Sequence, residues 1–211
     1  MAENEPIALE ALRHEVDRML YAGESRAHVL SRLAAVARRA AEGSDDWLFA
    51  VRMLAVLGAG ENPWKASLLA RRVLAHVPHA GDVWGALGLA QSILGNFAYA
   101  ARCYERALTV HATSGSKPLD SLRATLHHNL GHLYDVALDR PGDAVPHLSS
   151  ALSIATRARL ARTAREEIAA SLAHALARSG DATRAREVLG RAIRPSRRSA
   201  HAELMAFIER S

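Results

Sequence analysis

The sequence contains one cysteine, few aromatic residues and no long apolar run. The single cysteine, Cys103, excludes an internal disulfide framework and any metal site built from several thiolates. No apolar run reaches the roughly 18 residues that span a bilayer, and the first ten residues are acidic where a signal peptide is basic and then apolar. We therefore expect a soluble, cytoplasmic protein without a membrane partner.

Glycine and proline are also sparse, with 13 and 7 copies among 211 residues, and aromatic residues make up 5%. Alanine, leucine and arginine are abundant instead, and these residues favour helices over strands. Hydrophobic residues reach 49%, which is normal for a soluble domain and enough to form a core. The composition predicts an ordered, all-α protein.

Basic charge is concentrated towards the C-terminus. Residues 1–46 hold nine acidic residues and six arginines, a net −3, whereas residues 157–198 hold four acidic residues and eleven arginines, a net +7. Arginine accounts for 25 of the 27 basic residues. The sequence leaves two explanations of this excess open, a functional basic surface and the codon bias of a GC-rich genome.

Residues 83–108 contain two helical patterns separated by Gly95. In the first, a tryptophan is followed by a leucine and a glycine at offsets of three and four, and in the second two alanines flank a tyrosine. The residues concerned are Trp84, Leu87, Gly88, Ala100, Tyr104 and Ala107. Large residues at this spacing fill the gaps where small residues let two helices touch. The pattern resembles the signature of the tetratricopeptide repeat.

Weaker copies of the pattern place Ala50, His127 and Ala169 in the position of Trp84, at successive spacings of 34, 43 and 42 residues. The longer spacing of the last two units predicts longer helices there. Four repeats then cover residues 47–195, with an N-terminal capping helical hairpin in residues 1–46 and a C-terminal capping helix in residues 196–211. The resemblance implies a right-handed α-solenoid of antiparallel helix hairpins with about eleven helices.

The resemblance also implies a binding surface, because the first helix of each hairpin lines the concave groove in this family. We expect a non-enzymatic scaffold or regulatory module that binds a protein or peptide in that groove. Self-association is left open. The predicted groove residues are Arg52, Asp82, Leu89, His128, Asn129, His132, Asp135, Ser171, His174 and Arg178.

Histidines suggest a metal site as an alternative use of the same groove. His128, His132 and Asp135 share one helix face, and His174 occupies in the next unit the place that His132 has in its own. Imidazole and carboxylate groups bind transition metals. However, equivalent positions on successive repeats lie roughly 8–10 Å apart, which is too far for one ion unless both side chains reach inward. We therefore predict a polar groove lining and no metal.

Motifs for catalysis and cofactor binding fail on spacing. Gly58-Ala59-Gly60 lacks the preceding strand and third glycine of a dinucleotide-binding loop, so we predict a turn between helices. Cys103 has no histidine base beside it in the sequence. The sequence therefore predicts neither an enzyme nor a bound cofactor. Two tryptophans, Trp47 and Trp64, are interpreted as hairpin anchors.

The arginines of residues 157–198 indicate a second class of function, binding of nucleic acids or acidic partners. Aromatic residues for base stacking are not interleaved with these arginines. Helical spacing also predicts local ion pairs, Arg162 with Glu166 and Arg191 with Glu187. We expect the remaining charge to attract acidic proteins or nucleic acids weakly and in a salt-sensitive manner.

Overall fold

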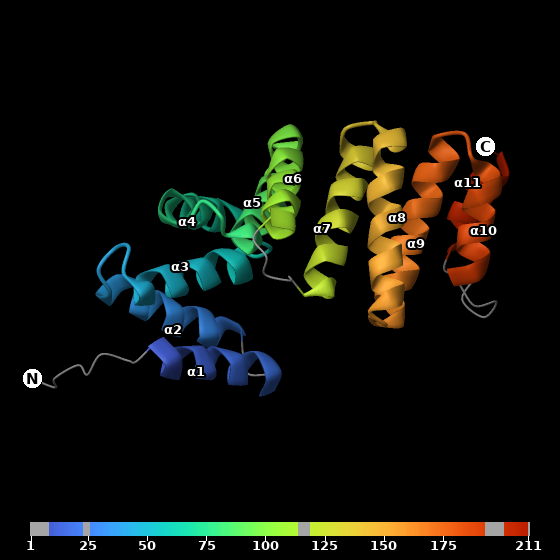
Figure 1. Ribbon diagram of the computed structural model, residues 1–211. Coiled ribbons are helices and arrows are strands. Elements are labelled where there is room, and N and C mark those ends of the chain that lie inside the picture. The colour runs from blue at the N-terminus through green and yellow to red at the C-terminus, as the bar shows by residue number, and fades with distance from the viewer. Residues whose placement is uncertain (1–8, 23–25, 114–118, 193–200, 211) are drawn as a thin grey trace, which may run out of the picture. The chain divides into compact units, whose positions relative to one another are not determined.

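The computed structural model describes residues 9–22, 26–113, 119–192 and 201–210 (Figure 1). Within these ranges the chain forms eleven α-helices, one short π-helical turn and no strand, so the prediction of an all-α fold with about eleven helices is confirmed. The elements are α1 (Leu9–Ala22), α2 (Arg26–Arg39), α3 (Asp45–Gly58), α4 (Pro63–His76), α5 (Gly81–Ile93), α6 (Phe97–Thr113), α7 (Asp120–His132), η1 (Leu133–Ala137), α8 (Pro141–Arg157), α9 (Arg162–Arg178), α10 (Ala182–Ala192) and α11 (Ala202–Arg210).

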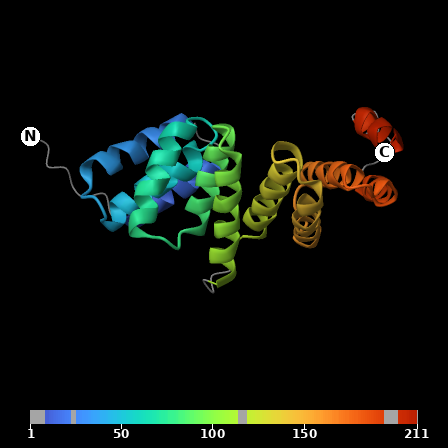
Figure 2. The ribbon, with the colours of Figure 1, turned by 90° about the horizontal axis from the view of Figure 1, so that it is seen from above.

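The chain divides into two compact units, Met1–Leu94 and Gly95–Ser211. The predicted repeat with the clearest signature, residues 83–108, therefore contributes α5 to the first unit and α6 to the second. Within each unit, successive helices pack mainly on their neighbours in the chain (Figures 1 and 2). None of the described helices is long and apolar enough to cross a membrane.

The core of the first unit joins α1, α2 and α3 through aliphatic side chains. Val16, Leu33 and Leu54 are buried together there, and Leu33 is wholly inaccessible. Burying a leucine of this kind stabilises a fold by about 1.5–3 kcal/mol. Farther along, α3, α4 and α5 meet through alanines, and Gln91 Nε2 donates a buried hydrogen bond of 2.6 Å to Ser67 Oγ. Small side chains thus allow the close helix contacts expected of this sequence.

The turn between α3 and α4 lies where Gly58 to Gly60 predict it. Asn62 caps α4 by accepting a hydrogen bond of 3.1 Å from the Lys65 amide, and Pro63 occupies the first turn, where its missing amide hydrogen costs nothing. Ser44 caps α3 in the same way. Local side chains therefore account for both helix starts.

Trp47 and Trp64 differ in a way that corrects the prediction. Trp47 is 3% exposed, and its ring meets the edge of His76 and the guanidinium of Arg72. Trp64 is 75% exposed, so its interpretation as a hairpin anchor is wrong. The reason is helical phase, because the buried face of α4 carries Ala66 and residues three or four positions on. Trp64 lies on the opposite face.

In the second unit, α7 and α8 cross at Gly131. A Cβ atom at Gly131 would lie 2.6 Å from Leu148 Cγ and 3.2 Å from the Ala144 carbonyl oxygen. Only glycine fits this crossing without displacing backbone or a buried leucine. In the repeat copy that starts at His127, Gly131 and Ala144 take the places of Gly88 and Ala100, where the pattern predicts that two helices touch, and the structure confirms this contact.

Helices α8 and α9 have 17 residues each, as the longer spacing predicted, although α6 is equally long. Alanine and isoleucine side chains form the core between α7, α8 and α9. The turn that follows α7 is not regular. Its five residues, Leu133–Ala137, are π-helical, and the Leu138 amide donates to the Leu133 carbonyl at 3.0 Å. Asp139 ends this turn with a φ of 53°.

Candidate functional site

Six of the predicted groove residues lie together in the second unit, on α7, η1 and α9. The set consists of His128, His132, Asp135, Ser171, His174 and Arg178, and we call it the inner-face cluster. His128 Nε2 lies 3.1 Å from Ser171 Oγ, which connects the middle of α7 to the middle of α9. The cluster thus bridges the first helices of two successive predicted repeats.

Asp135 is the structural centre of the inner-face cluster. Its carboxylate is 2% exposed, and it accepts from Arg178 Nη1 at 2.9 Å and contacts His174 Nδ1 at 2.5 Å. Arg178 also donates to the Asp135 carbonyl oxygen and to the Asp139 carboxylate. A buried carboxylate is stable only when such partners replace its water. The prediction that Asp135 is an accessible groove residue is therefore corrected. Its side chain is buried and positions His174 and Arg178.

The π-helical turn and the residues after it supply the acceptors for Arg178. Asp135 lies within η1, and Asp139 lies two residues after its end. Short π-helical segments of this kind are frequent at functional sites. Here the turn lets one guanidinium on α9 bond a buried carboxylate, a backbone carbonyl and an exposed carboxylate at once. The end of α7 is thereby attached to the end of α9.

The accessible part of the inner-face cluster is rich in imidazole. Burial lowers the pKa of His128, the nearby Glu167 carboxylate partly opposes this effect, and His132 adds to it. His128 is therefore neutral near pH 7 and presents one donor and one acceptor nitrogen. The rings of His128 and His132 lie 6.4 Å apart, and His132 is exposed. The arrangement suits hydrogen bonding to a polar ligand.

Four predicted groove residues do not join this cluster. Asn129 is hydrogen-bonded to the Tyr104 hydroxyl, which ties it to α6. The other three belong to the first unit. Arg52 on α3 forms a two-pronged ion pair with Asp82 on α5, with both N–O distances at 2.8 Å, and Leu89 on α5 is 36% exposed. These three residues therefore lie on α3 and α5 and do not belong to the inner-face cluster of the second unit.

The structure offers the histidines no third ligand for a metal. Within the described ranges, no group of three or more histidine, cysteine, aspartate or glutamate side chains could hold an ion. Asp135 and His174 do approach each other, but Arg178 occupies the remaining space around the carboxylate. A guanidinium in that place repels a cation.

One contact of the site, between α9 and α11, could not be placed from the sequence. Phe207 of α11 stacks on His174 with ring centroids 5.4 Å apart and an interplanar angle of 27°. The sequence predicted α11 as a capping helix, and its apolar spacing was the only available hint of this contact. Tertiary packing determines which residue of α9 the Phe207 ring contacts.

A second polar cluster, the His127 cluster, connects α6, α7 and α8. His127 Nδ1 lies 3.3 Å from His147 Nδ1, and Tyr134 stacks on His147 with centroids 5.8 Å apart. The Tyr134 hydroxyl donates to Glu105, and the Arg140 guanidinium lies 5.0 Å from the Tyr134 ring. Burial, His147 and Arg123 lower the pKa of His127 to about 4. Burial and the Glu105 hydrogen bond raise the pKa of Tyr134 to about 12.

Solved structures of similar shape agree on the fold. A protein from Podosopora anserina with nearly identical TPR-like repeats of the kinesin light chain type has a TM-score of 0.64 at 19% identity, covering 90% of this chain and 95% of its own. A MamA structure has a TM-score of 0.65 at 14% identity, covering 93% and 95%. The fold is of the tetratricopeptide repeat type. No family model matches the sequence, and no curated protein matches it significantly.

The tetratricopeptide-type fold explains why the inner-face cluster forms. In such a fold, successive first helices pack side by side, so positions on α7 recur on α9 at the same height. His128 meets Ser171 and Asp135 meets Arg178 for this reason, because each pair is separated by 43 residues, close to the spacing of the repeat.

Proposed function

We propose that the protein is a non-enzymatic scaffold or regulatory module that binds a polar peptide segment of a partner protein across the inner-face cluster. One observation carries the proposal. A buried Asp135 holds Arg178 and His174 on α9, and Ser171, one turn before His174 on the same helix, contacts His128 on α7. Preorganised hydrogen-bonding groups of this kind lose little entropy when a ligand arrives.

The arrangement also argues against hydrolysis. Ser171 contacts His128, whereas Asp135 contacts a different histidine, His174. Among the described residues of the cluster, no single histidine joins a hydroxyl to a carboxylate, as nucleophilic catalysis by a Ser-His-Asp relay needs. The Asp135 carboxylate is moreover already bonded to Arg178. The side chains are therefore suited to binding.

We extend the proposal to the organisation of the chain. Residues 47–195 form the repeat array, residues 1–46 cap its N-terminus, and residues 196–211 cap its C-terminus. The exposed Leu89 makes the face of α3 and α5 in the first unit a separate contact area for an apolar side chain. We assign the module to the cytoplasm, with which a single, buried cysteine, Cys103, is compatible.

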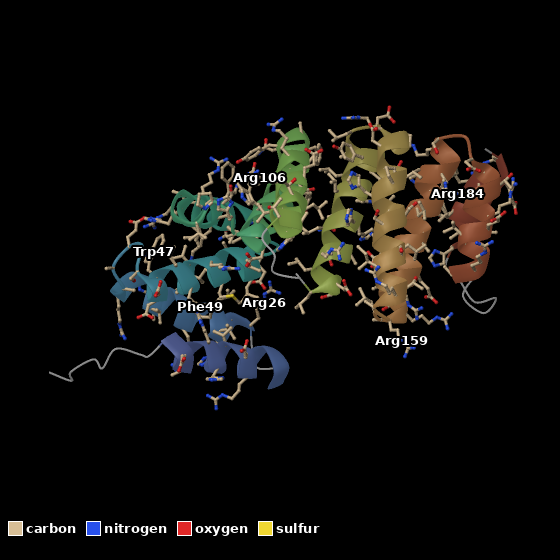
Figure 3. All side chains as sticks on the ribbon, in the orientation of Figure 1. Arg26, Trp47, Phe49, Arg106, Arg159 and Arg184 are labelled. Carbon is tan, nitrogen blue, oxygen red and sulfur yellow. The ribbon has the colours of Figure 1, made fainter. Side chains whose placement is uncertain are left out.

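The proposal can be tested by affinity capture with matched variants. Wild-type protein, His132→Ala and Arg159→Ala are immobilised and exposed to native extract, with and without nuclease. Partners that bind through the cluster should be lost with His132→Ala and kept with Arg159→Ala, because Arg159 is exposed in the turn between α8 and α9, outside the cluster (Figure 3). Nuclease should change nothing. Equal capture by both variants would contradict the proposal.

A further inference from the structure

A pocket of about 520 Å³ lies between α8, α9 and α10 in the second unit. Its floor is apolar and its rim is basic. We call it the basic pocket, and it is lined by Leu152, Thr156, Arg162, Arg165, Glu166, Val188, Arg191 and Ala192. The pocket and the inner-face cluster use opposite faces of α9, because about 100° separates successive helical residues. A ligand here would leave the inner face accessible.

Arg165 makes the basic pocket unusual. Its Nε atom is buried and finds no hydrogen-bond partner among the described residues. Nearly all buried donors in proteins are paired. The neighbouring arginines are already engaged, because Arg162 Nε donates to Glu166 at 2.6 Å and Arg191 contacts Glu187 at 3.3 Å. The Nε–H group of Arg165 is therefore left without an acceptor among the described residues.

The local backbone adds to this preference for an anion. Arg162 begins α9, and no side chain caps the amide groups of its first turn. Exposed amides and the helix dipole favour negative charge at such an end. Three arginines face one carboxylate, Glu166, in the lining. The potential in the pocket is therefore positive.

We propose that the basic pocket binds the carboxylate of an acidic side chain in a peptide, with an adjacent aliphatic side chain on its floor. The Arg165 guanidinium bonds the carboxylate in a charge-assisted manner. Leu152 and Val188 provide the apolar contact. A polynucleotide fits less well, because no aromatic side chain among the lining residues offers a stacking surface for bases. This site goes beyond the proposed inner-face function and does not depend on it.

The test observes the Arg165 Nε–Hε signal directly by NMR. The probe is the blocked peptide acetyl-Leu-Glu-Leu-amide, and its control is acetyl-Leu-Gln-Leu-amide, which has the same shape without the charge. The glutamate peptide should shift the Arg165 signal in a saturable way, and the glutamine peptide should not. The Arg184 signal serves as an internal control, because Arg184 is exposed on α10 outside the pocket (Figure 3).

Variants separate the site from general charge. Arg165→Gln should weaken binding of the glutamate peptide about tenfold or more, whereas Arg184→Gln, with the same loss of charge, should leave it unchanged. Equal shifts by both peptides, or no shift of Arg165 at millimolar peptide, would overturn the proposal. So would an Arg165 response to inorganic phosphate or duplex DNA that exceeds the response to the peptide. The wild-type measurement decides these cases even if Arg165→Gln fails to fold.

Discussion

The Nδ1 atom of His174 lies 2.5 Å from Oδ2 of Asp135, a carboxylate that is 2% exposed. This contact joins α9 to the π-helical turn after α7 and brings an imidazole to the inner face of the second unit. The same carboxylate holds Arg178. One buried acid therefore positions two side chains of the proposed binding surface.

The first prediction concerns Asp135. Replacing Asp135 with Ala should lower the free energy of unfolding by about 1–3 kcal/mol, because Arg178 and His174 lose the buried carboxylate that they share. Asp139→Ala is the matched control, since Arg178 also bonds this carboxylate but Asp139 is 84% exposed. It should cost less than about 1 kcal/mol. Urea unfolding measures both, and equal losses would show that burial of Asp135 does not matter.

The second prediction concerns Gly131. Gly131→Ala should destabilise the second unit by about 1–3 kcal/mol, because the added methyl group would overlap Leu148 and press on the Ala144 carbonyl. Gly190→Ala is the control within the same unit. A Cβ atom at Gly190 meets nothing within 4 Å, so this change should stabilise the helix by up to about 1 kcal/mol. Thermal unfolding should move the two variants in opposite directions.

The features that sequence reasoning predicted are those with local causes. The predicted turn at Gly58–Gly60 is followed by a helix that Asn62 caps and Pro63 begins, and Gly131 lies at a crossing where only a small residue fits. The ion pairs of Arg162 with Glu166 and of Arg191 with Glu187 also follow from helical spacing, and both are present. The six residues of the inner-face cluster were predicted as groove residues from the register of the repeat.

Other features depend on tertiary packing and left no local signal. The segment Leu133–Ala137 is π-helical, but no residue type in it signals this. Its hydrophobic pattern looks the same as that of a regular α-helical turn. Burial of Asp135 depends on Arg178, a residue 43 positions later. Whether Trp64 or Trp47 is buried depends on which face of each helix meets its neighbour. For Trp64, the residue type alone suggested the wrong face.

The third prediction is a dependence of stability on pH through His127. Its pKa is about 4 in the folded protein and about 6.5 when unfolded, so between these values the unfolded chain binds a proton that the folded chain does not. Stability from this group is therefore complete above pH 6.5 and falls as the pH drops towards 4. Because His127 is partly exposed, we expect a loss on the order of 1–2 kcal/mol.

Two measurements check this pH dependence. An NMR titration of the His127 ring should have its midpoint near pH 4, and a midpoint near 6.5 would contradict the prediction. Urea unfolding at pH 7 and pH 4 should show a smaller difference for His127→Gln than for the wild type. His147 and His128 also have lowered pKa values through burial, so the variant should flatten the profile only in part.

The last prediction compares the two tryptophans of the first unit. Trp47→Ala removes a ring that is 3% exposed and lies 5.5 Å from the His76 ring and 4.9 Å from the Arg72 guanidinium. Such a change should cost about 3–5 kcal/mol through lost burial and an unfilled cavity. Trp64→Ala removes a ring of equal size that is 75% exposed, so it should change stability by no more than about 0.5 kcal/mol. Urea unfolding of the two variants measures the contrast.

A cost for Trp64→Ala approaching that of Trp47→Ala would mean that Trp64 is buried in solution, against another part of the chain or against a second molecule. Repeating the measurement at several protein concentrations distinguishes these cases, because only burial in an oligomer makes the stability concentration-dependent.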